Sequence, residues 1–189
     1  MERCRHGSRD GWKQKVRRTR CGCGHPCWCL ACSRRPTTLA LFLAAQFTDD
    51  EASVLTEARL ARQAILEQAD QPQATFVLDE TVLHRQIGSS VTMAEQLDHI
   101  ADAAELRYVN IHVLPALDAN AGLSGSFSIA GADSLPETLL METVEDHTTQ
   151  DRALVRRAAV IFDLVRRDAL PRVPSRAFIL EASEQWKTR

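Results

Sequence analysis

The chain has 189 residues, enough for one domain with a tail, and its 44% apolar and 25% charged residues are typical of a soluble globular protein. This composition excludes collagen-like, fully disordered and multi-pass membrane proteins. The net charge of −2 conceals two unlike regions. Residues 1–38 carry ten basic against two acidic residues (net +8), whereas residues 39–189 carry 13 against 23 (net −10). We expect the acidic body not to bind nucleic acid specifically, because it repels phosphate backbones.

The first 38 residues form a basic, cysteine-rich head. All six cysteines fall within its first 32 positions, and its residues show neither strand nor helix periodicity. We therefore expect the head to be disordered unless a metal organises it. Its Arg, Gly, Cys, Trp, His and Pro content is also typical of a GC-rich gene translated out of frame. The predicted organisation is this head over residues 1–38 and an α+β domain over residues 39–189.

Five closely spaced cysteines in the head suggest a metal site, since thiolates with the His25 imidazole suit zinc or copper(I). A structural zinc site usually pairs two C-x2–4-C knuckles across a spacer of about a dozen residues. Here all five cysteines fall within twelve residues, and the one C-x2-C pair, Cys29 and Cys32, lacks a second half across such a spacer, so a functional metal site is the weaker interpretation. Zinc analysis after removal of residues 1–38 is the obvious test. The candidate ligands are Cys21, Cys23, Cys27, Cys29 and Cys32.

The body, residues 39–189, contains no cysteine, which fits a reducing cytoplasm. Its longest apolar run, Leu39–Ala45, is too short for a bilayer-spanning helix of about 20 residues. As part of a signal peptide this run would follow an unusually long n-region. We expect a cytoplasmic protein without membrane contact.

Order is expected to begin near Leu39, and the first helix is predicted over residues 48–70. Thr48 precedes Glu51 by three residues, which is the spacing of a capping box. An apolar stripe at helical spacing follows, formed by Val54, Ala58, Ala61 and Ile65.

A βαβ unit is predicted between residues 74 and 115. Residues 74–80 form a β-rich run, and residues 108–115 alternate between apolar and polar side chains as a half-buried strand does. The helix between them, residues 90–106, presents one apolar face made of Met93, Leu97, Ile100 and Ala104. Strand, helix and strand over this length favour a right-handed parallel unit.

A hairpin and two helices complete the body. Residues 125–132 and 138–144 are expected to pair as antiparallel strands. A helix within residues 148–170 buries Leu154, Ala158, Ile161, Phe162 and Val165, and the last helix takes Ser175 as its N-cap. The predicted fold class is therefore α+β, with a mixed sheet of about four strands.

Polar residues of the body match no catalytic motif. Glu80 and His84 are four residues apart, and we expect a surface ion pair, because the HExxH zinc motif needs a second histidine. No G-x-S-x-G elbow accompanies His112, and the body has no cysteine nucleophile. A hydrolase using Glu80, His112 and Glu142 stays open as an alternative that requires these groups to converge in one cleft.

Residues 40–185 carry a series of motifs whose order and spacing resemble one family. The series comprises Arg62-Gln63, the FVLDE strand at 76–80, Leu83, Arg85 and Gly88, Met93-x2-Gln96-Leu97, the VLP end at 113–115, Gly122-Leu123, the GSF step at 125–127 and Glu142. The chain is similar to the C-terminal domain, of unknown function, of actinobacterial Xre-type helix-turn-helix regulators. These regulators are discussed as antitoxin-like and are often encoded beside a small partner protein. The helix-turn-helix and the Pro-Gly-Leu-Leu-Gln opening of that family are not found in residues 1–38.

The resemblance implies a non-enzymatic, cofactor-free domain of a cytoplasmic regulator that lacks its own DNA-binding module. This domain binds an effector ligand or a small partner protein, and homodimerisation stays open. Four polar positions could line its binding surface: Glu80, Arg85, Gln96 and Glu142. Glu80 and Arg85 either serve recognition or fix the turn after the first strand, and replacing Glu80 by Ala should cost under about 1 kcal/mol in the first case. The alternative function is a small zinc-binding protein organised by the cysteine head.

Overall fold

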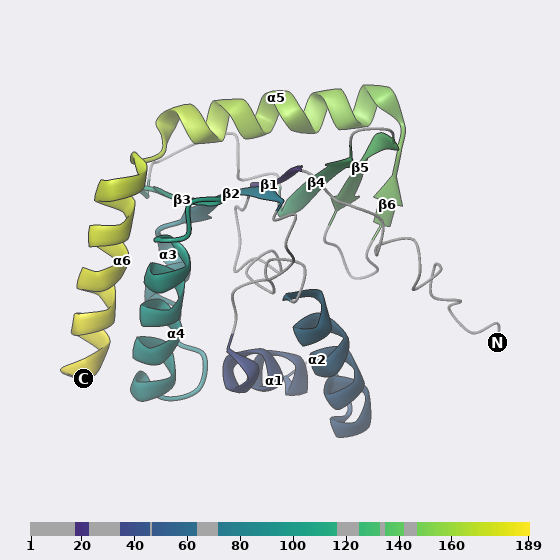
Figure 1. The fold of residues 1–189 in the computed structure, drawn as a ribbon. Helices are drawn as coiled ribbons and strands as arrows, with labels where there is room; N and C mark the ends of the chain where they lie inside the picture. The colour runs from purple at the N-terminus through teal and green to yellow at the C-terminus, as the bar shows by residue number, and fades with distance from the viewer. Residues whose placement is uncertain are drawn as a thin grey trace.

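The computed structural model describes residues 18–22, 35–45, 47–63, 72–116, 125–132, 135–141 and 147–189, and Figure 1 shows their arrangement. Helices and a single mixed sheet are combined, which confirms the predicted α+β class. The strands are β1 (Arg18–Gly22), β2 (Gln73–Asp79), β3 (Val109–Leu114), β4 (Phe127–Ala132), β5 (Leu135–Met141) and β6 (His147–Thr149). The helices are α1 (Pro36–Ala44), α2 (Asp49–Gln63), α3 (Thr81–His84), α4 (Ser90–Ala103), α5 (Arg152–Asp168) and α6 (Arg172–Lys187).

The sheet has a parallel half and an antiparallel half, joined at β1. Its strand order is β3-β2-β1-β4-β5-β6. β1 runs parallel to β2, which runs parallel to β3, whereas β4, β5 and β6 pair in antiparallel fashion outward from β1. The predicted parallel βαβ unit is confirmed as β2, α3, α4 and β3, and the predicted hairpin is confirmed as β4 and β5.

Helices cover the two faces of the sheet unequally. Figure 1 shows α5 lying along one face, while α3, α4 and α6 stand on the other face under β2 and β3. The core on the α4 and α6 side includes Phe76, Leu97, Ile111, Ile179 and Trp186. The core under α5 includes Val77, Leu114, Phe127, Ile129, Leu139, Val155, Phe162 and Val165. Alternate residues of β2 and β3 therefore serve different cores, as the period of two requires.

A third, smaller cluster joins α1 to α2 through Leu39, Leu43 and Ala52. Arg35, just before α1, joins this part of the chain to α4: its backbone N–H donates to the Gln96 Oε1 at 2.9 Å, and its guanidinium pairs with Glu95 at 3.0 Å. Gly88 lies at the turn before α4 with a φ of +74°, a backbone conformation that favours glycine.

The largest departure from the expected fold lies in the head. Residues 18–22, which we expected to be disordered, form β1 between β2 and β4. A strand can be held by backbone bonds to neighbours on both sides, and this stabilisation leaves no periodic signal in its side chains. With β1 and the short β6, the sheet has six strands where about four were predicted. The remainder of the predicted head, residues 1–17 and 23–34, lies outside the described residues.

The predicted buried faces of two helices were partly wrong. In α2, Val54 is 53% exposed, and Ala52 with the partly buried Leu55 faces α1 instead. In α5, Leu154 is exposed and its neighbour Val155 is buried, whereas Ala158, Phe162 and Val165 are buried as expected. Both helices are rotated to meet neighbours that are distant in sequence, which periodicity alone does not determine. Residues 64–71 of the first predicted helix lie outside the described residues.

Side chains cap several helices where local sequence allows it. The Glu51 carboxylate accepts from the Thr48 backbone N–H and hydroxyl, so the predicted Thr48–Glu51 pairing is confirmed. The Asp151 carboxylate accepts from two backbone N–H groups at the start of α5. Ser175 is not the cap of α6, because that helix begins at Arg172 and encloses it.

Candidate functional site

The predicted site residue Glu80 lies just beyond the carboxyl end of β2, where parallel sheets commonly bind ligands. One carboxylate oxygen accepts the Ala116 backbone N–H at 2.7 Å, and the other lies 4.0 Å from the His84 Nε2, the expected ion pair. Neighbouring Asp79 is 6% exposed and accepts from the Thr81 backbone N–H at 2.9 Å. The Glu80 carboxylate thus joins the segments that follow β2 and β3, whereas Asp79 fixes the start of α3, and the bond to Ala116 favours the scaffold interpretation of Glu80.

The other predicted partner-binding residues are dispersed. Arg85 is exposed after α3, whereas Gln96 is 5% exposed and holds the backbone of Arg35. Glu142 lies outside the described residues. Glu80 and His112, named together for a hydrolase, bond to separate partners.

Of the candidate metal ligands, Cys21 lies in β1, opposite Phe76 and Ser128, while Cys23, Cys27, Cys29 and Cys32 lie outside the described residues. Within the part of the chain that is described, no three His, Cys, Asp or Glu side chains gather closely enough to hold a metal ion. Because residues 1–38 include a central strand, deleting them would disturb the sheet as well as any metal site. Serine substitutions at Cys27, Cys29 and Cys32 would test zinc binding more cleanly.

An open hollow of about 350 Å³ lies where β3 meets the junction of α5 and α6. Its lining is formed by His112, Asp163, Arg166, Arg167, Ala169 and Pro171. Sequence analysis had singled out only His112 among them. For Arg166 and Arg167 the sequence offered one indication, the five arginines within residues 152–168. Such a pattern usually indicates only a solvated helix face.

One wall of this hollow is fixed by four hydrogen bonds to the α5–α6 junction. The Leu170 backbone N–H donates to the Val113 carbonyl oxygen at 2.8 Å. The Leu170 carbonyl accepts from the Ser175 hydroxyl and bonds to the His112 Nδ1, both at 2.9 Å. Ser175 Oγ in turn accepts the Val113 N–H at 2.9 Å. A carbonyl oxygen only accepts, so the His112 Nδ1 carries a hydrogen that it donates to Leu170.

The charged side chains around the hollow differ in whether they already have an ion-pair partner. Arg167 donates through Nε to the Asp168 carboxylate at 2.9 Å and through a terminal nitrogen at 3.3 Å, and these bonds raise the pKa of Arg167. Asp163 and Arg166 are exposed, and neither has an ion-pair partner among the described residues. The hollow is therefore lined by a carboxylate and a guanidinium that do not form an ion pair with each other.

A second surface lies on the side of α5 that faces away from the sheet. Arg156, Val160 and Leu164 are four residues apart, and Arg157 precedes Val160 by three, so these four share one helix face. We call them the outer face of α5. Val160 is 54% exposed and Leu164 is 37% exposed. This face therefore presents an apolar pair beside two arginines.

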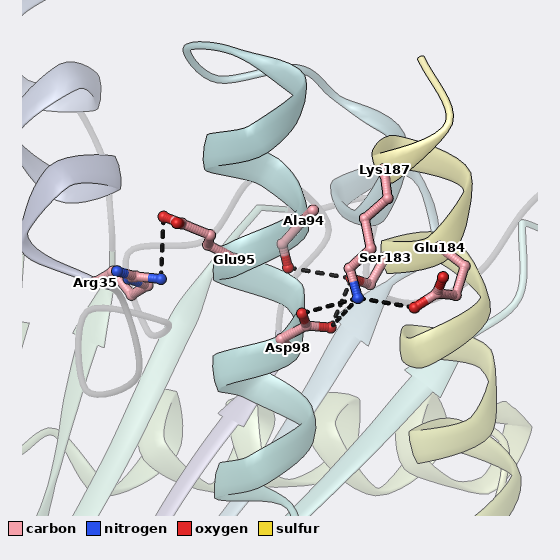
Figure 2. Close-up of polar contacts among 7 residues, drawn as sticks. All are labelled: Arg35, Ala94, Glu95, Asp98, Ser183, Glu184 and Lys187. Atoms are coloured by element: carbon pink, nitrogen blue, oxygen red, sulfur yellow. Dashed lines mark hydrogen bonds and ion pairs between the residues drawn. The ribbon is translucent and has the colours of Figure 1, made fainter.

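The polar residues between α4 and α6, by contrast, are engaged with one another. Figure 2 shows Ser183, which is fully buried, donating toward the Asp98 carboxylate at 2.6 Å and the Ala94 carbonyl at 3.2 Å. Lys187 lies 3.1 Å from Asp98 and 2.7 Å from Glu184. Burial raises the pKa of Asp98, but the hydrogen bonds from Ser183 and Lys187 outweigh it, and the net shift is downward. This seam is structural.

The comparisons with known proteins identify a family but not a function. A family model described as "Domain of unknown function (DUF5753)" matches residues 35–181. The chain belongs to this family. The DUF5753 region thus covers every helix down to most of α6 and every strand except β1. Neither the comparison with curated proteins nor that with solved structures gave a match. Among the helices that the structure describes, none is both long and apolar enough to cross a membrane.

Proposed function

We propose that this DUF5753 domain is the partner-binding part of an antitoxin-like transcriptional regulator of the Xre type, acting in the cytoplasm. The proposal begins from the resemblance to the C-terminal domains of such regulators. Its DNA-binding helix-turn-helix would be supplied outside the 189 residues of this sequence. Occupancy of the partner surface would alter DNA binding through a coupling of about 1–3 kcal/mol, the usual range for linked sites.

The observation that carries the proposal is the outer face of α5. Val160 and Leu164 offer apolar contact area at the centre of the face, and Arg156 and Arg157 lie beside them. Interfaces are enriched in arginine and bury an apolar centre within a polar rim. None of these four side chains bonds to another described residue, so partner binding would not disrupt the fold.

The charge of this face specifies the partner. An acidic protein surface that carries an apolar segment would complement it, and electrostatic attraction would raise the association rate in a salt-dependent way. DNA is the less suitable occupant, because the body that carries α5 has a net charge of −10 and would repel a long phosphate backbone. A second copy of the chain is a further possible occupant that the test below separates.

The test is co-expression of the full chain with a small acidic protein encoded beside its gene, the kind of partner that the resemblance implies, followed by co-purification and mass measurement of the complex. The double variant Arg156→Glu and Arg157→Glu should lose the complex while keeping its melting temperature. The matched control, Arg85→Glu with Arg107→Glu, changes net charge equally at exposed arginines elsewhere and should retain it.

Three results would overturn the proposal. Loss of the complex only in the Arg85→Glu, Arg107→Glu variant would mean that the partner binds near Arg85 and not at the outer face of α5. A complex made solely of this chain would replace the partner by a second copy. Tight, sequence-selective DNA binding by the 189-residue chain would contradict the partner-binding role altogether.

A further inference from the structure

The hollow beside His112 is an open depression of the surface, and its lining residues differ from those of the outer face of α5. Its volume of about 350 Å³ falls at the lower end of the roughly 300–1,000 Å³ that is typical of ligand pockets. Its wall is preorganised, because the α5–α6 junction is bonded to β3 through both the N–H and the carbonyl of Leu170. A fixed wall lowers the entropy cost of binding.

The chemistry of the lining indicates what would fill the hollow. Arg166 has no carboxylate partner among the described residues, and its planar guanidinium fits a carboxylate or phosphate group. Asp163 lies three residues earlier on α5, and its carboxylate can only accept hydrogen bonds. The His112 ring donates its Nδ1 hydrogen to the Leu170 carbonyl, which leaves its Nε2 nitrogen for a polar contact with a ligand.

An anion alone would leave Asp163 and His112 unpaired and would be repelled by the Asp163 carboxylate. A ligand that carries a donor group next to its charge would satisfy both sides at once. We propose that this hollow binds a small carboxylate or phosphate that also bears an amino or hydroxyl group, with Arg166 binding the negative group and Asp163 and His112 binding the amino or hydroxyl group. Arg167 lends positive charge while remaining bonded to Asp168.

The test uses nuclear magnetic resonance of the full chain, with the ring signals of His112 assigned by a His112→Gln variant. The probes are glycine, glycolate and glycerol 3-phosphate, and the comparison compounds are acetate and ethylene glycol, each of which lacks one of the two groups. Saturable shifts of the His112 signals are expected with probes that carry both groups. The carboxylate and phosphate probes also distinguish the two sources of negative charge.

Variants then assign the roles within the hollow. Arg166→Gln should weaken binding of every probe by about tenfold or more, which corresponds to about 1.4 kcal/mol. Asp163→Asn should reduce the advantage of glycine over acetate. Arg152→Gln, which changes an exposed arginine on the same helix but outside both the hollow and the outer face, is the matched control and should leave probe binding unchanged.

Two outcomes would overturn the inference. His112 signals that stay unmoved up to about 10 mM probe would mean that any Kd lies well above the millimolar range and that no site exists. Equal weakening by Arg152→Gln and Arg166→Gln would mean general attraction of anions to α5. Failure of this test leaves partner binding standing, because the outer-face variants measure that function separately.

Discussion

The two faces of the sheet are covered by helices that are held in different ways. On one face, α6 is joined to α4 and β3 by polar bonds of Arg172, Arg176, Ser175 and Ser183, and Trp186 donates to the Leu83 carbonyl at 2.8 Å. On the other face, α5 packs through an apolar core, and among the described residues none of its charged side chains bonds to the sheet. Polar groups that are used for the fold cannot also bind a partner. The guanidinium groups of Arg156 and Arg157 on α5 have no bonding partner among the described residues, which supports our proposal that recognition occurs on that helix.

Arginines illustrate this difference well. The Arg172 guanidinium donates to the Ala104 carbonyl at 2.6 and 3.0 Å, so it caps the end of α4. Arg176 donates to the Ala101 carbonyl and pairs with Glu105 at 2.6 Å. Cations at a helix C-terminus also interact favourably with its dipole. Arg156 and Arg157 have the same chemistry without such partners.

The largest effect is expected from removal of β1, which joins the parallel and antiparallel halves of the sheet. A chain that begins at residue 35 should lose cooperative unfolding, because β2 and β4 would each lose a strand neighbour. Circular dichroism during thermal unfolding, with size-exclusion chromatography to detect aggregates, measures this. A fragment 35–189 as stable as the whole chain would show that β1 is dispensable.

The next largest effect is expected at Trp186, which is 2% exposed on α6. Trp186→Ala should lower the free energy of unfolding by about 3–5 kcal/mol, the usual cost of truncating a buried aromatic residue. Trp186→Phe keeps most of the volume but leaves the Leu83 carbonyl unpaired, so it should still cost about 1–3 kcal/mol. Denaturant titration gives both values. The contrasting change on α5, Phe162→Leu, should cost less than about 1.5 kcal/mol, and equal costs for the two mild changes would contradict the polar-versus-apolar distinction.

Ser175→Ala tests the polar anchoring of the α5–α6 junction. The change leaves the buried Val113 N–H without its acceptor, and we expect a loss of about 2 kcal/mol in unfolding free energy. Hydrogen exchange at Val113 and Leu170 should accelerate while exchange within α5 stays unchanged. Uniform acceleration across the domain would indicate global rather than local loosening.

Glu80→Ala distinguishes a scaffold from a recognition residue at the end of β2. Because its carboxylate accepts the Ala116 N–H at 2.7 Å, we expect a loss of about 1 kcal/mol in stability and no change in partner binding. Glu80→Gln keeps an acceptor and should recover part of the loss. Loss of partner binding at unchanged stability would restore the recognition role.

The smallest effect concerns acid stability at the α4–α6 seam. The pKa of Asp98 is lowered in the folded state, so its contribution is present above the unfolded pKa of about 3.9 and is lost as pH falls through the folded value. Asp98→Asn should therefore flatten the fall in stability below about pH 4 while costing at most about 1 kcal/mol at neutral pH, since the pair is partly exposed. Denaturant midpoints across this range measure it. If the fall in stability with decreasing pH is unchanged in Asp98→Asn, Asp98 does not contribute to acid stability.

Local features of the fold were accessible from the sequence because they depend on neighbours along the chain. Alternation in residues 109–113 predicted β3, the Met93–Leu97–Ile100 spacing predicted the buried side of α4, and Thr48 with Glu51 predicted a helix start. The candidate site was less accessible. Glu80 and Gln96 were selected as polar positions, but their roles depend on Ala116 and Arg35, which are 36 and 61 residues away.

The sequence by itself thus determined an α+β domain with a βαβ unit, a hairpin and amphipathic C-terminal helices, because hydrophobic periodicity and capping act over a few residues. Only the tertiary structure decided that β1 enters the sheet, that Val155 rather than Leu154 is buried, and that His112 meets Asp163 and Arg166 at one hollow. These outcomes depend on backbone pairing and packing between segments far apart in the chain, whose free energies have no local counterpart in the sequence.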